Sequence, residues 1–262
     1  MPNFPFENIE TAVDHARGHV AQWRLSQNYR GVPPIKTWLQ VAESADFKTL
    51  KAEIPSETFY AVDTSHTQQD WKVPHIYRIR LRDSLGVEVV SDPFPFDLDR
   101  IPRSKYLLAS EIVRREYVRL QYVGQSGWLL KHRNFGVQAT QDVDPVTGVV
   151  LTDNPTSFGT GFNGGYYPAV RMLFSQEDYR QETKLDEQGL GVKHVETVSL
   201  RSPCFPDVDV HDIVVSAAGK RWYVADVQTH WFPGTRTALM HTSQCRVVPC
   251  TDSVYHVPVP AV

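Results

Sequence analysis

Three aspartates that lie close together, Asp207, Asp209 and Asp212, are the first side chains in the sequence that could do chemistry. A pair of neighbouring carboxylates is what glycoside hydrolysis requires, because one acts as the acid and the other as the nucleophile or base. The residues between them alternate in polarity, which is typical of a strand edge with Val208 and Val210 facing inward. We favour the strand edge and keep a glycan-processing enzyme as an alternative.

The glycine-rich stretch 159–168 invites a phosphate-binding interpretation, which fails in detail. It lacks the Gly-Lys-Ser or Gly-Lys-Thr ending that brings a lysine to a phosphate, and Tyr166-Tyr167-Pro168 leads into an expected strand instead of a helix. The histidines and cysteines lack the spacing of a zinc site, and no Gly-x-Ser-x-Gly motif occurs. We therefore predict no catalytic residue, no cofactor, no metal and a protein that is not an enzyme.

The composition is that of a folded, mainly β protein. Hydrophobic residues make up 41% of the 262 residues and charged residues 22%, and the 18 prolines and many aromatic residues favour strands and loops. The formal net charge of -3 argues against broad binding to duplex phosphates. The three cysteines are expected to be buried, reduced thiols. With no apolar run of membrane-spanning length and no secretory signal, we expect synthesis in a cytoplasm and no membrane partner.

Residues 1–96 are expected to form a β-sandwich with Trp23 and Trp38 in its core. Its expected strands share short, alternating patterns and cover residues 19–25, 36–43, 58–62, 75–82 and 87–90. Trp23 in an early strand, Trp38-Leu39-Gln40-Val41 in the next and the later hairpin resemble an immunoglobulin-like or fibronectin type III domain. That resemblance implies contacts and not chemistry.

The proline-rich segment 91–96 is expected to link this sandwich to a second, β-rich connector domain over residues 97–262. The connector domain is predicted to contain a helix over about 104–123, a glycine-rich hairpin over about 136–168 and a C-terminal β domain over about 195–259. We expect Ser104 to cap the helix and Gly124 to end it. The polar segment 175–192 is expected to be an exposed loop or arm.

The expected helix carries an apolar stripe with helical spacing, formed by Leu108, Ile112, Val113, Tyr117 and Leu120. Three arginines, Arg114, Arg115 and Arg119, lie off this stripe. They are either a solvated face or a contact with another subunit or a portal.

The segment from Gly127 to Pro168 resembles a class of tailed-bacteriophage neck proteins. In that class a basic strand leads into two Cys-x-x-Cys pairs joined by a hairpin, followed by a Gly-Thr-Gly-Phe-x-Gly-Gly-Tyr-Tyr signature. The basic strand here is 129–133 and the signature is 159–167. The cysteine positions of the class fall at Ala139, Asp142, Asn154 and Ser157, so the resemblance implies a degenerate zinc knuckle without its metal. A second likeness to head-closure proteins lies in Arg221-Trp222-Tyr223-Val224 and in residues 255–259.

The resemblance implies a structural virion protein in the phage neck, where about six or twelve copies form a ring that joins the portal and head to the tail. Its implied partners are further copies of itself, a portal or head-tail adaptor protein, and tail terminator or tail tube and sheath proteins, with at most transient contact with DNA in the channel. The residues expected to make contacts are Lys131, Arg133, Gly159, Gly161, Gly164, Tyr166, Tyr167, Arg114, Arg115 and Arg119. The alternative is a carbohydrate- or receptor-binding β module of a phage tail or surface adhesin, with Trp128 and Trp231 among its contact residues.

Overall fold

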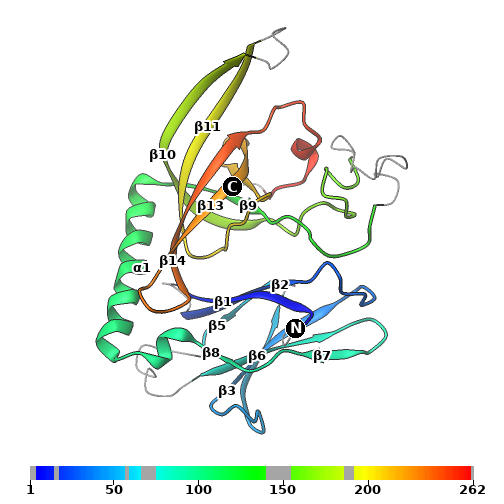
Figure 1. Cartoon of the computed structure of the whole chain (residues 1–262), viewed down its shortest axis with the longest axis vertical. Helices are drawn as coiled ribbons and strands as arrows, with labels where there is room; N and C mark the ends of the chain where they lie inside the picture. Colours follow the sequence, from blue (N-terminus) through cyan, green and yellow to red (C-terminus); the bar gives the residue numbers. More distant parts are fainter. Residues whose placement is uncertain are drawn as a thin grey trace. The chain divides into compact units, whose positions relative to one another are not determined.

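The computed structural model describes residues 4–14, 18–56, 59–65, 75–139, 155–185 and 192–260 (Figure 1). They form a mainly β protein with one long helix, which confirms the predicted fold class. The chain divides into two compact units. The first comprises Met1–Arg115, Asn134–Gly136 and Trp231–Leu239, and the second comprises Glu116–Arg133, Val137–His230 and Met240–Val262. The first unit therefore extends beyond the segment 1–96 that the sequence pattern suggested.

Two sheets build the first unit. One contains β1 (Phe6–Asp14), β2 (Gly18–Leu25) and β5 (Tyr60–Asp63). The start of β14 (Thr237–Val247) extends this sheet, because Thr237 and Ala238 pair in parallel with Thr11 and Ala12 of β1. The second sheet has the order β4 (Leu50–Ser56), β3 (Lys36–Ala42), β6 (Ile76–Arg82) and β7 (Glu88–Val90), with β8 (Phe94–Pro95) also paired to β6.

Trp23 and Trp38 differ in burial because the side chains of a strand alternate between its two faces. Trp23 is buried, as predicted. Trp38 is only half-buried, so its predicted place in the core is wrong. The register pairs Trp38 with Arg80, which puts both side chains on one face of the sheet, and the guanidinium of Arg80 lies 4.5 Å from the centre of the Trp38 ring. The opposite face of β6 carries the buried Tyr77.

The long helix, α1 (Arg103–Val123), matches the predicted range to within one residue and follows the short 3-10 helix η1 (Asp97–Arg100). Since α1 begins at Arg103, Ser104 lies in its first turn and the prediction that Ser104 caps it is wrong. Gly124 ends the helix as predicted, donating its N–H to Leu120 O at 2.9 Å. A Cβ at residue 124 would lie only 2.4 Å from that oxygen. Within the described ranges, no helix has the length and apolar character needed to span a membrane.

The buried stripe of α1 differs from the predicted one. Its members recur every three or four residues and are Tyr106, Ala109, Val113, Glu116 and Leu120. Leu108, expected on this stripe, is 55% exposed. Glu116 can occupy a buried position on this stripe because its carboxylate is paired with Arg119 and Arg201.

The second unit is a closed antiparallel barrel. Its strands are β9 (Gln125–Leu130), β10 (Val170–Leu185), β11 (Val192–Pro203), β12 (Ile213–Ser216), β13 (Arg221–Trp231) and the later part of β14. Their order is β11-β10-β9-β12-β13-β14, and pairing of β11 with β14 closes the circle. Closure removes the free edges that an open sheet would expose. Leu129, Phe174, Val214 and Trp222 belong to its apolar core.

Two predicted boundaries in this unit are wrong. The expected basic strand over 129–133 ends at Leu130, and the chain from Lys131 onward runs irregularly beside residues 155–167. The expected loop over 175–192 is strand as far as Leu185. Residues 140–154 of the predicted glycine-rich hairpin, which include Asp142 and Asn154, lie outside the described residues.

β10 and β11 continue past the barrel as a two-stranded extension (Figure 1). β9 pairs with β10 only over Val170–Phe174, and β14 pairs with β11 only over Thr197–Pro203. Beyond these limits, Gln181–Leu185 and Val192–Glu196 pair only with each other among the residues that the structure describes. We call these two segments the β10–β11 ribbon.

Candidate functional site

Lys131 is a buried cation at the end of β9, and three carboxylates surround it. Its side chain is 5% exposed. Its Nζ contacts Oδ2 of Asp209, lies 3.1 Å from Oδ2 of Asp212 and lies 3.5 Å from Oδ2 of Asp207. The same Nζ donates to the backbone carbonyl of Asp207 at 3.1 Å. A buried ammonium requires such partners, because its removal from water is otherwise costly.

The aspartates lie on the segment between β11 and β12, which is not the strand edge that we favoured. Val208 is buried, but Val210 is 41% exposed, so the two valines do not share an inward face. The segment turns because the Asp212 carboxylate accepts the backbone N–H groups of Asp209 at 2.8 Å and His132 at 2.9 Å. These bonds bring all three aspartates to the same lysine.

Two ionisable groups near Lys131, Asp212 and His241, have pKa values that differ from their usual ones. Asp212 is fully buried, and burial raises its pKa even though the nearby Lys131 ammonium lowers it. His241 is also buried, with Nε2 3.6 Å from Oδ1 of Asp207, and burial lowers its pKa, which keeps the imidazole neutral. Asp212 therefore keeps a proton up to a higher pH than an aspartate in water does.

A cavity of about 430 Å³ adjoins this cluster within the second unit. The side chains that could bind a polar group in its lining are His132, Tyr166, His211, Tyr223, Arg246 and Asp252. Nδ1 of His211 contacts the hydroxyl of Tyr223, and the rings of His132 and His211 lie 5.7 Å apart. Burial raises the pKa of both tyrosines, so their hydroxyls stay protonated and can donate hydrogen bonds.

The glycine signature 159–167 builds one wall of this cavity, which includes Gly159 and Thr160. Gly165 shows why glycine is needed in the signature: its φ is +62°, and a Cβ there would lie 2.7 Å from Ser157 O. The signature thus forms a tight fold beside the barrel. Ser157, at a cysteine position of the resembling class, is fully buried, as Ala139 nearly is.

The basic residues Lys131, His132 and Arg133, which follow β9, do not form an exposed surface patch. Lys131 is buried, and His132 and Arg133 are half-buried. Lys131, Tyr166 and Tyr167, all expected to make contacts, are buried in this unit. Arg133 donates from Nε to Tyr166 O at 2.9 Å, and its guanidinium lies 4.9 Å from the centre of the Tyr167 ring. A Cβ added at Gly164 would lie 3.6 Å from Nε of Arg133.

The helix arginines divide into two groups. Arg114 and Arg115 are exposed, and both pair with Glu111, at 2.6 and 2.8 Å. Arg119 instead pairs with the buried Glu116 at 2.8 Å. Of these three arginines, Arg114 and Arg115 are the more exposed to solvent, and Arg119 is the less exposed.

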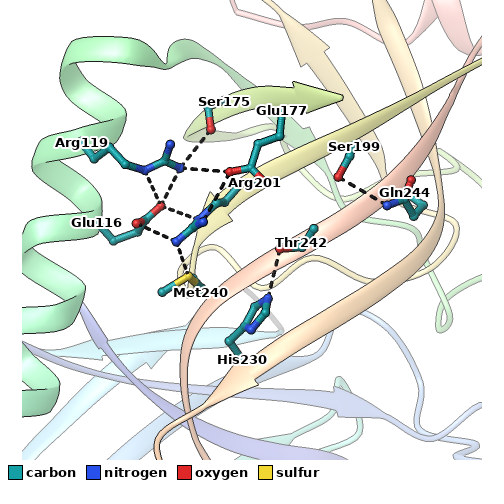
Figure 2. Close-up of polar contacts among 10 residues, drawn as sticks. All are labelled: Glu116, Arg119, Ser175, Glu177, Ser199, Arg201, His230, Met240, Thr242 and Gln244. Atoms are coloured by element: carbon teal, nitrogen blue, oxygen red, sulfur yellow. Dashed lines mark hydrogen bonds and ion pairs between the residues drawn. The ribbon is translucent and has the colours of Figure 1, made fainter. Parts of the chain in front are cut away.

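Figure 2 shows how Glu116 joins α1 to the barrel within the second unit. Oε1 of Glu116 also lies 2.8 Å from Nε of Arg201 in β11. Both Arg119 and Arg201 lie within 3.5 Å of Glu177 in β10. Two arginines and two glutamates thus form a charge-balanced cluster. Sequence reasoning missed Glu116 and Arg201; the only signal was a glutamate at a stripe position of the helix.

The first unit contains a buried polar cluster of its own. His19 in β2 binds the hydroxyls of Tyr77 and Tyr106, at 3.1 and 3.3 Å. The Tyr77 hydroxyl donates to Asp63 at 3.0 Å, and Nδ1 of His75 lies 3.3 Å from the same carboxylate oxygen. These bonds join β2, β5, β6 and the first half of α1.

No family model matches the chain, and no curated protein matches it. Among the described residues, no group of three or more histidine, cysteine or acidic side chains is placed to hold a metal ion. All three cysteines are free, and Cys250 is exposed, which corrects the expectation that all are buried.

Proposed function

We propose that the protein is a structural subunit of the neck of a tailed bacteriophage, where it forms a ring that joins the portal and head to the tail. The sequence support is the likeness of residues 127–168 and of the C-terminal segment to neck and head-closure proteins. The structural observation that carries the proposal is the β10–β11 ribbon, which continues past a closed barrel.

The ribbon is suited to a contact between subunits for a physical reason. A two-stranded hairpin is only marginally stable in water, and it gains stability when a further strand or an apolar surface covers it. If each copy places its ribbon on the next copy, the contact is heterologous, and a rotation that closes produces a ring. Ring closure then multiplies the strength of contacts that are modest individually.

In this proposal the work of the protein is assembly and not catalysis. Its partners are its own copies, a portal or head-tail adaptor protein on one side, and tail terminator or tail tube and sheath proteins on the other. The exposed Arg114 and Arg115 are available for such contacts. Any contact with DNA is transient, during its passage through the channel.

Native mass spectrometry and electron microscopy of the full chain test the proposal. We expect closed rings of about six or twelve copies, alone or after addition of the portal protein. A variant in which a short glycine-containing turn replaces residues 181–196 should stay monomeric and keep its circular dichroism spectrum. A matched control replaces the exposed turn at Ala218-Gly219-Lys220 with another turn sequence and should still form rings. A full chain that stays monomeric or trimeric with the portal present would overturn the proposal.

The second candidate is a carbohydrate- or receptor-binding module. One observation favours it: Trp231, a large aromatic side chain of the kind that stacks on sugars, is 41% exposed. A glycan array probed with the wild type and with Trp231→Ala distinguishes the two functions. Binding that is lost in the variant, from a chain that forms no rings, would favour this candidate.

A further inference from the structure

We propose that Lys131 and Asp209 condense to form an intramolecular amide, which joins the end of β9 covalently to the segment before β12. This inference is independent of ring formation. It concerns a covalent modification within one chain, and it can hold or fail whatever the protein assembles with.

The two reacting groups are held against each other by the fold. Nζ of Lys131 contacts Oδ2 of Asp209, although the two residues are 78 positions apart in sequence. The backbone is fixed at both: the Lys131 carbonyl accepts the N–H of Tyr167 at 2.9 Å, and the Asp209 N–H donates to Asp212 at 2.8 Å. Groups held in this way react as though present at effective concentrations on the order of 10⁵ M or more.

Asp212 is placed to move the protons. Its Oδ2 lies 3.1 Å from Nζ of Lys131, and the same oxygen accepts the N–H of Asp209, so it lies beside both reacting residues. Its side chain is 1% exposed, and burial raises its pKa. A carboxylate in such surroundings can take a proton from an ammonium and deliver it to a leaving oxygen.

The reaction balances without any other reagent. The Lys131 ammonium gives one proton to Asp212, and the free amine attacks Cγ of Asp209, forming the Nζ–Cγ bond. The nitrogen loses its second proton, both protons pass to one oxygen of Asp209, and the Cγ–O bond breaks. An ammonium and a carboxylate thus become one amide and one water molecule, with no oxidation or reduction.

Asp209 is the acceptor that the geometry favours among the three aspartates. Both carboxylate oxygens of Asp212 accept backbone N–H groups, which holds this side chain as a proton carrier. Asp207 is farther from Nζ, at 3.5 Å, and its other oxygen faces His241. The Asp209 side chain is 26% exposed, so the water that is released has a path to solvent.

The product would replace a costly buried ion pair by a neutral amide. Separating a lysine and a carboxylate from water carries a desolvation penalty, which the amide avoids. The bond would also close a loop of the chain permanently, between the end of β9 and the segment that leads into β12.

Intact-mass measurement of the full chain, purified after folding and then denatured, tests the inference directly. We expect a mass lower than that of the sequence by one water molecule. A protease digest should contain one branched peptide with Lys131 joined to Asp209. A wild-type mass equal to that of the sequence, after prolonged incubation of the folded protein at neutral pH, would overturn the inference, and so would a link at a different aspartate.

Variants separate the roles of the three residues. Lys131→Arg and Asp209→Ala should keep the full mass, because each lacks one reacting group. Asp209→Asn should lose ammonia instead of water and give the same branched peptide. Asp212→Asn keeps both reacting groups and should form the amide far more slowly, or not at all. The matched controls Lys220→Arg and Asp226→Ala change exposed residues outside the cluster and should lose one water as the wild type does. Loss of water from Lys131→Arg would refute the assignment even if other variants failed to fold.

Discussion

Arg201 in β11 lies with its Nε 2.8 Å from Oε1 of Glu116, and this contact ties the barrel to the second half of α1 (Figure 2). Glu116 is the acidic member of a stripe that is otherwise mainly apolar, and its side chain is 8% exposed. Its position is tolerated because two arginines compensate for the loss of water around its charge.

Replacing this carboxylate should therefore destabilise the second unit. We expect Glu116→Ala to lower the free energy of unfolding by about 3 kcal/mol, because it leaves Arg201 and Arg119 without their nearest partner. Urea unfolding followed by circular dichroism measures the change. The control is Glu111→Ala, which removes an equally close partner of Arg114 and Arg115 on an exposed face and should change stability little. Similar losses in the two variants would contradict this account.

The first unit should lose stability in acid through Asp63. Burial alone would raise the pKa of this carboxyl, but hydrogen bonds from His75, Ser65 and Tyr77 hold it well below its usual range. A carboxyl whose pKa is lowered on folding contributes its full stabilisation above the unfolded pKa of about 4, and this contribution is lost progressively as the pH falls from there through the lower pKa of the folded protein. Asp63→Asn should thus destabilise most at pH 7 and less at pH 3, where part of the contribution is already lost.

Unfolding free energies of the wild type and Asp63→Asn at the two pH values give the comparison. The control is Asp92→Asn, an exposed aspartate in the same unit. A difference between the wild type and Asp63→Asn that stays constant from pH 7 to pH 3 would count against the hydrogen-bonded carboxylate.

The cysteines should differ sharply in reactivity. Burial raises the pKa of the Cys245 thiol to about 12, and Cys204 is buried, whereas Cys250 is exposed. Because the thiolate is the reactive form, maleimide at neutral pH should label one cysteine in the folded protein. Mass spectrometry should show a single adduct, none in Cys250→Ser, and three adducts after unfolding of the wild type. Early labelling of Cys245 in folded protein would disprove the prediction.

The glycine signature should tolerate substitution poorly at Gly165. Alanine there meets both an unfavourable φ of +62° and backbone crowding, with Ser157 O only 2.7 Å from the new Cβ. At Gly219 the φ is +82°, but no heavy atom lies within 4 Å of a new Cβ. Gly219→Ala should therefore cost about 1 kcal/mol, the penalty for the left-handed conformation alone. Gly165→Ala should cost clearly more, as thermal unfolding of the two variants would show.

Local sequence patterns correctly predicted the elements that are stabilised by contacts between residues close together in the sequence. The spacing of apolar residues and Gly124 predicted α1 to within one residue, because a helix makes its own hydrogen bonds. Trp38 was misplaced because its face depends on the register with β6, which a single strand does not encode.

The candidate site was harder to predict because its partners are far apart in sequence. Lysines are normally solvated, so Lys131 beside His132 and Arg133 was interpreted as part of a contact surface. Its three aspartates lie 76 or more residues later, and only the folded chain brings them together. Glu116 was missed for the same reason, since its partner Arg201 is 85 residues away.

The parallel pairing of β14 with β1 has a consequence for how the chain is made. Thr237 and Ala238 are fully buried parts of the first unit, yet they follow almost the whole of the second unit in sequence. A ribosome releases the first strands of the chain long before these residues emerge. The first unit therefore stays incomplete after most of its residues have been translated. The β1 edge of its sheet remains uncovered until nearly all of the barrel strands have left the exit tunnel.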